Sequence, residues 1–218
     1  MTKSHPQDET THKIVDRFCH QIVWLKQIYY IYCELFEDDN AKFLMQKTTP
    51  GFFADINKIL IDYLLLEIAK LTDPAKSSKV ENFTVANLIE SIDWPPDCLK
   101  RIKKLNKTVL AFRKHIEPAR NKLLAHYDKT TVISKKTLGA FPKGEDKKLL
   151  DALEQMCNIM HEAAFGDIYG SIALDGSVLD FKETLVKAIT FDKHFAESKG
   201  EDLSRLFRLL QDVRSGQP

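Results

Sequence analysis

The stretch that decides the fold is IKKLNKTVLAFRKHIEPARNKLLAHYD, residues 102–128. Its apolar side chains recur at alternating steps of three and four residues, the period at which a helix places hydrophobic groups along one face. They are Ile102, Leu105, Val109, Phe112, Ile116, Ala119 and Leu123. The pattern continues through Pro118, which removes a backbone donor and crowds the preceding turn. We therefore predict one long helix with a kink at Pro118.

The same period recurs on both sides of this stretch. It predicts further helices over residues 13–37, 50–73, 84–92, 146–165, 181–191 and 203–213. Thr49 and Pro50 suit the start of the second of these, and residues 38–40 are expected to end the first. Residues 75–81 and 130–144 are expected to connect helices, the latter with a short hairpin as an alternative. The fold class is all-α, a helical bundle with additional short helices.

Composition is that of a globular chain. With 218 residues, of which 44% are hydrophobic, the chain can bury a core within one domain. We predict a polar N-terminal segment over residues 1–12, a helical domain over residues 13–195 and a C-terminal helix and tail over residues 196–218. Neither a signal peptide nor a membrane span is recognised. Four scattered cysteines, Cys19, Cys33, Cys98 and Cys157, are expected to be free thiols in a cytoplasmic protein.

Positive charge is concentrated in residues 100–129. The formal net charge of the whole chain is +1. The window holds two acidic residues and ten basic ones, a charge of +8, so the remainder of the chain carries −7. The basic residues are Lys100, Arg101, Lys103, Lys104, Lys107, Arg113, Lys114, Arg120, Lys122 and Lys129. Such a window is typical of a phosphate-binding track, although lysines on an amphipathic helix also commonly form a solvated face.

The end of this window carries the candidate chemistry. Arg120 and Asn121 are followed after four residues by His126. Arginine stays protonated and can bind phosphate oxygens through two donors, and histidine can transfer a proton near neutral pH. On a straight helix Arg120 and His126 flank the apolar stripe about 9 Å apart along the axis, so one subunit does not bring both to one phosphate. A two-fold partner could supply the missing half, and we therefore expect a homodimer.

The motif and its surroundings resemble a known family. Arg120-Asn121, four residues and His126 are similar to the Arg-x(4–6)-His signature of the HEPN superfamily. Ile68-Ala-Lys-Leu-Thr-Asp73-Pro74, Asn87-Leu88-Ile89 and residues 120–128 resemble the HEPN-like family of abortive phage infection type U. The likeness spans roughly residues 18–191. It implies a helical bundle, a dimer and, as in many HEPN proteins, a ribonuclease of a toxin or phage-defence system that needs no metal or other cofactor.

The resemblance also implies roles for individual residues. Arg120 would stabilise charge on the scissile phosphate, His126 would transfer a proton, and Asn121 would orient the site. Use of the ribose 2′-hydroxyl as nucleophile would restrict cleavage to RNA. The expected RNA contacts are Lys104, Lys107, Arg113, Lys114 and Lys122.

Two features keep other readings open. Tyr127 follows His126 directly, so the His-x-Tyr extension of HEPN toxins paired with nucleotidyltransferase antitoxins is missing, and the cognate antitoxin is left open. HEPN families also include inactive members. The alternative function is a non-catalytic, dimeric HEPN-like module that binds RNA or protein. Cys157 and His161 are one helical turn apart, but no second pair of ligands accompanies them, so no metal site is predicted.

Overall fold

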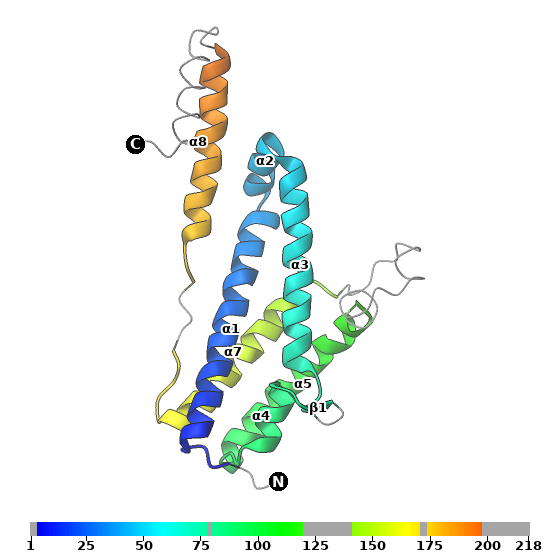
Figure 1. Cartoon of the computed structure of the whole chain (residues 1–218), viewed down its shortest axis with the longest axis vertical. Helices are drawn as coiled ribbons and strands as arrows, with labels where there is room; N and C mark the ends of the chain where they lie inside the picture. Colours follow the sequence, from blue (N-terminus) through cyan, green and yellow to red (C-terminus); the bar gives the residue numbers. More distant parts are fainter. Residues whose placement is uncertain (1–3, 78–79, 120–140, 171–173, 198–218) are drawn as a thin grey trace. The chain divides into compact units, whose positions relative to one another are not determined.

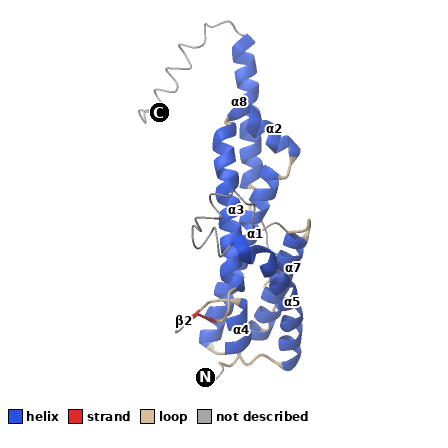
Figure 2. Cartoon of the chain, turned by 90° about the vertical axis from the view of Figure 1, so that its right-hand side faces the viewer, coloured by secondary structure: helices blue, strands red, loops and turns tan. Residues whose placement is uncertain are grey.

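Helices make up nearly all of the structure in Figure 1, a computed structural model that describes residues 4–77, 80–119, 141–170 and 174–197. The helices are α1 (Glu9–Phe36), α2 (Asp39–Thr48), α3 (Pro50–Thr72), α4 (Val85–Ser91), α5 (Pro96–Ala119), α7 (Glu145–Phe165) and α8 (Ser177–Glu197). Two very short strands, β1 (Lys76–Ser77) and β2 (Val80–Glu81), pair antiparallel, with Lys76 opposite Glu81 (Figure 2). The predicted all-α class is confirmed.

The contacts divide the chain into two compact units. The first comprises Met1–Tyr30 and Lys58–Leu174, and the second comprises Ile31–Asn57 and Asp175–Pro218. The helices α1 and α3 contribute residues to both. Within the described ranges, no helix is both long and apolar enough to cross a lipid bilayer.

The first unit has a core of large apolar side chains from five helices. The predicted stripe of α5 lies in it: Ile102, Val109, Phe112, Ile116 and Ala119 are buried. Its fully buried neighbours are Phe18, Ile22 and Leu25 of α1, Leu71 of α3, Leu88 of α4, and Leu149, Leu153 and Met156 of α7. Burying each such side chain stabilises the fold by about 1.5–3 kcal/mol, so this stripe fixes which face of α5 is left for solvent.

The second unit is held by an ion-pair cluster and by aromatic packing. Helices α2 and α8 pack on one another. Lys182 of α8 bonds to Glu34 at 3.0 Å and to Asp38 at 2.5 Å. The Lys182 ammonium, together with the backbone N–H of Asn40, lowers the pKa of the Asp38 carboxyl. Phe53 and Phe181 lie with ring centroids 6.0 Å apart.

Helix boundaries follow local capping chemistry. Asp38 accepts a hydrogen bond from the Asn40 backbone N–H and starts α2, a helix that the sequence analysis did not predict. Thr84 caps the predicted α4 in the same way, at 3.1 Å from the Asn87 nitrogen. The helix α5 begins at Pro96, six residues before the predicted stripe, because proline suits the first helical turn.

The expectation of four free thiols was wrong for two of the cysteines. Cys19 of α1 and Cys157 of α7 form a disulfide, with their Cα atoms 5.4 Å apart. That separation is usual for a disulfide, and it arises because the two helices share one core. Cys33 and Cys98 lie outside this disulfide.

Candidate functional site

The described part of the candidate site is helix α5. Lys104, Lys107, Arg113 and Lys114 of the predicted RNA contacts lie on it, and the helix is described as far as Ala119. Arg120, Asn121, Lys122 and His126 lie outside the described residues. The structure therefore describes the site as far as the residue that precedes the Arg/His motif.

A row of lysines occupies the solvent-facing side of α5. Lys100, Lys103, Lys104, Lys107 and Lys114, called here the lysine face, are all exposed. At about 100° and 1.5 Å per residue they lie within an arc of roughly 100°, opposite the buried stripe, and extend about 21 Å along the axis. Like charges at this spacing repel one another, and binding of a polyanion relieves this repulsion.

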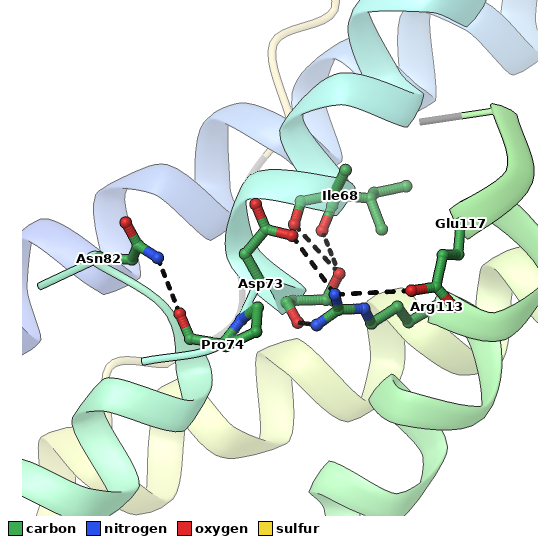
Figure 3. A network of polar contacts seen from close by, with 8 residues as sticks. Ile68, Asp73, Pro74, Asn82, Arg113 and Glu117 are labelled. Atoms are coloured by element: carbon green, nitrogen blue, oxygen red, sulfur yellow. Dashed lines mark hydrogen bonds and ion pairs between the residues drawn. The ribbon is translucent and has the colours of Figure 1, made fainter. Parts of the chain in front are cut away.

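Arg113 differs from these lysines because its guanidinium has protein partners. It donates a hydrogen bond to the Thr72 backbone oxygen and pairs with Asp73 at 3.5 Å and with Glu117 at 3.9 Å (Figure 3). The side chain is only 23% exposed. Thr72 is the last residue of α3, where the carbonyls of the final turn lack helical partners and favour a cation. Arg113 thus joins the end of α3 to the last turns of α5.

The same junction continues into the loop after α3. The Thr72 hydroxyl donates to the Ile68 carbonyl at 2.9 Å, and the Asn82 amide donates to the Pro74 carbonyl at 2.9 Å (Figure 3). The space between Arg113 and the end of α3 is no more than about 10 Å³, so the contact is close. Sequence analysis used Asp73-Pro74 as the end of a predicted helix and as part of a resemblance, and it did not connect Asp73 with Arg113. The i, i+4 spacing of Arg113 and Glu117 could have predicted the ion pair between these two residues.

A groove of about 310 Å³ opens between α5 and α7. Arg101 and Lys104 line it from α5, and Gln155, Asn158 and Glu162 line it from α7. Arg101 and Glu162 form an ion pair at 3.8 Å with both side chains more than half exposed. Sequence analysis assigned no role to the α7 side of this groove.

Cys98 lies near this groove at the start of α5. It is buried, and its thiol points to the Ile159 carbonyl at 3.9 Å. Burial raises the pKa of the thiol to about 11, a shift that nearby Glu162 reinforces and Arg101 opposes. A thiol held in its neutral form is a poor nucleophile, so Cys98 serves packing.

The remaining histidine of α5 is separate from the motif. His115 is half-buried and meets Phe112 edge-on, with ring centroids 6.4 Å apart. Among the described residues no three His, Cys, Asp or Glu side chains are grouped closely enough to hold a metal ion.

Comparison with protein-family models decides the family. A HEPN family model described as AbiU2 matches residues 8–187. The chain belongs to the AbiU2 family. The match runs from the start of α1 into α8 and includes Arg120, Asn121 and His126, which confirms the resemblance drawn from the motif. No curated protein and no solved structure matches this AbiU2 chain. The family places it among HEPN-type abortive-infection modules.

Proposed function

We propose that this AbiU2-family chain is a metal-independent endoribonuclease of a phage-defence or toxin system. The observation that carries the proposal is the family match across the Arg120–His126 motif, directly after a helix with five exposed lysines. The lysine face supplies attraction for a phosphate backbone without base specificity. The motif supplies the groups that cleavage requires.

The proposed reaction is an internal transesterification of RNA. The ribose 2′-hydroxyl gives up its proton as its oxygen attacks phosphorus, the bond from phosphorus to the 5′-oxygen breaks, and a proton is delivered to that leaving oxygen, so no net proton is consumed. His126 moves a proton at one of these two oxygens, Arg120 neutralises charge on the phosphoryl oxygens, and Asn121 orients the site. The products are a 2′,3′-cyclic phosphate and a 5′-hydroxyl. A homodimer would bring two copies of the motif together and could in this way supply the second group that the 9 Å offset of Arg120 and His126 on a straight helix keeps away from one phosphate.

The deciding experiment is cleavage of total RNA and of a tRNA pool by the purified full chain in EDTA. Wild type should yield 2′,3′-cyclic phosphate ends, and Arg120→Ala and His126→Ala should each lose at least about a hundredfold in rate. His115→Ala is the matched control, since it removes a histidine of α5 that lies outside the motif. Loss of cleavage in the control, or equal cleavage by all four proteins, would contradict the assignment.

A second function is favoured by the lysine face itself, because that surface could hold RNA without cutting it. In that case the chain is a dimeric binding module, and RNA binding persists with no product from any substrate. Growth distinguishes the two functions in cells. Induced ribonuclease should arrest growth and His126→Ala should relieve the arrest, whereas a binding module should leave growth unchanged in both forms. Relief by a co-expressed neighbouring gene product would reveal a cognate antitoxin.

A further inference from the structure

The groove between α5 and α7 has the size and the mixed lining of a nucleotide subsite. Its volume of about 310 Å³ lies at the lower end of the range for small-molecule sites. It is lined by two cations, two amides, one carboxylate and apolar groups that include Ile168. Such a combination can receive a phosphate, the edge of a base and the face of a base at once.

The cationic side of the groove is available to a phosphate. Lys104 is exposed and has no ion-pair partner in the described part of the chain. Among the described residues Arg101 forms an ion pair with Glu162 alone, at 3.8 Å, and their side chains are 61% and 54% exposed. Exposed pairs of this kind are weak because water screens them, so Arg101 can exchange Glu162 for a phosphate at small cost.

The opposite side of the groove can meet a base. Asn158 accepts a hydrogen bond from the Gly170 backbone N–H at 3.1 Å, so its oxygen is engaged and its amide N–H groups are left to donate. Gln155, one turn earlier on α7, is exposed and offers both a donor and an acceptor. Ile168 is 63% exposed, so its apolar surface is open to a ligand in the groove. Amide side chains read base edges in pairs of hydrogen bonds, and an apolar surface accepts the face of a ring.

The groove also adjoins the lysine face. Lys104 belongs to both, and Lys100, Lys103 and Lys107 lie within one turn of it on the same helix. A phosphate backbone that follows the lysine face therefore reaches the groove without leaving α5.

From these contacts we propose that the groove binds one unpaired nucleotide of single-stranded RNA. The phosphate lies on Lys104 and Arg101, the base lies against Ile168, and Gln155 and Asn158 hydrogen-bond to its edge. The inference rests on the proposed function for its ligand class, RNA. It places a recognition site about 22 Å along α5 from Ala119, the residue before the motif, so the preferred RNA spans several nucleotides. A base paired in a duplex has its Watson–Crick edge occupied by its partner, so it could not offer that edge to these amides.

The test is RNA binding by the full-length protein, measured by fluorescence anisotropy over a series of salt concentrations. The probes are labelled 12-nucleotide 2′-O-methyl strands of A, C or U, which cannot be cleaved through the 2′-oxygen, and a duplex of the same length. Gln155→Ala should weaken binding of at least one base about fivefold and leave the salt slope unchanged. Lys104→Ala should weaken all strands and reduce the slope by about 0.7. Glu162→Gln should tighten binding, because it releases Arg101.

The controls separate this site from general attraction to charge. Lys147→Ala removes an exposed lysine of α7 away from the groove and should reduce affinity less than Lys104→Ala. Circular dichroism checks that each variant is folded, and Gln155→Glu provides a second probe, since an added carboxylate should repel the phosphate more strongly than alanine. The inference is overturned if Gln155→Ala, Gln155→Glu and Ile168→Ala all bind every strand like wild type, or if the duplex binds as well as single strands.

Binding and cleavage fail independently in this design. If wild type cleaves RNA and groove variants bind normally, the groove inference falls and the proposed function stands. If groove variants lose binding and no RNA is ever cleaved, the nucleotide site in the groove is supported, and the binding-module function is favoured over the ribonuclease. If no RNA binds at all, both fall.

Discussion

The side chain of Arg113 binds other parts of the protein, whereas the side chain that follows it in sequence faces solvent. Its guanidinium serves Thr72, Asp73 and Glu117, whereas adjacent Lys114 is exposed. We expect Arg113→Ala to lower the free energy of unfolding by about 1–2 kcal/mol, because it removes the side-chain donor to the Thr72 carbonyl and one ion-pair partner of the partly buried Asp73 carboxylate. Arg113→Lys should recover part of the loss, since it keeps the charge without the planar fork. Urea unfolding measures both.

Lys114→Ala is the matched control for this prediction. It removes the same charge one position along the helix, and it should change stability by less than about 0.5 kcal/mol. An equal loss in both alanine variants would mean that charge alone, and not the contact with α3, accounts for the effect.

Cys98 gives a prediction about alkaline pH. Its pKa in the folded chain is raised to about 11 from a usual 9.0, chiefly by burial. Above pH 9 the unfolded chain releases the thiol proton and the folded chain retains it, so Cys98 contributes stability below pH 9 that is lost as pH rises toward 11. Cys98→Ala should therefore unfold with a weaker dependence on pH between 9 and 11. Parallel pH profiles for the two proteins would show that the thiol does not titrate differently on folding.

At the scale of elements, the sequence predicted those helices whose apolar period was uninterrupted. The stretches over residues 50–73, 84–92 and 146–165 match α3, α4 and α7 closely because their apolar stripes are continuous, and Thr84 also caps α4. The helix α2 was missed because Asp38, Asp39 and Asn40 suit a helix end as well as a helix start. Which reading holds depends on packing against α8, which local sequence does not encode.

The candidate site also has features that the sequence predicts and features that it does not. Exposure of Lys104, Lys107 and Lys114 follows directly from their angle to the buried stripe. The partners of Arg113 do not, since Asp73 lies forty residues away and meets it only when α3 and α5 pack. The amides of α7 that line the groove carry no motif and become visible only in three dimensions.

The disulfide that joins α1 to α7 leads to a prediction about stability. The disulfide between Cys19 and Cys157 spans 138 residues of sequence, and closing a loop of this length constrains the unfolded chain. Cys19→Ser, or reduction, should lower the free energy of unfolding by about 3–5 kcal/mol, whereas Cys33→Ser should have little effect. A thiol titration of the denatured, unreduced protein should count two free thiols, and four after reduction. Four thiols without reductant would contradict the pairing.

At the scale of the whole molecule, charge position matters more than net charge. The chain carries only +1, yet Lys100, Lys103 and Lys107 stand together on one exposed side of α5. Replacing these three by Gln should weaken RNA binding at least about tenfold and flatten its salt dependence. Replacing Lys58, Lys143 and Lys147 by Gln changes net charge equally and should have a much smaller effect in the same filter-binding titration. Equal losses would assign RNA attraction to overall charge.

The course of α1 and α3 has a consequence for how the protein can be divided. Each helix runs without a break from one compact unit into the other, with the unit boundaries at Tyr30 and Lys58 inside hydrogen-bonded turns. A truncation at either boundary would cut a helix and expose new unpaired backbone groups. The units are therefore unsuited to separate expression or to exchange as modules between related chains, and insertions are better tolerated between helices than at these boundaries.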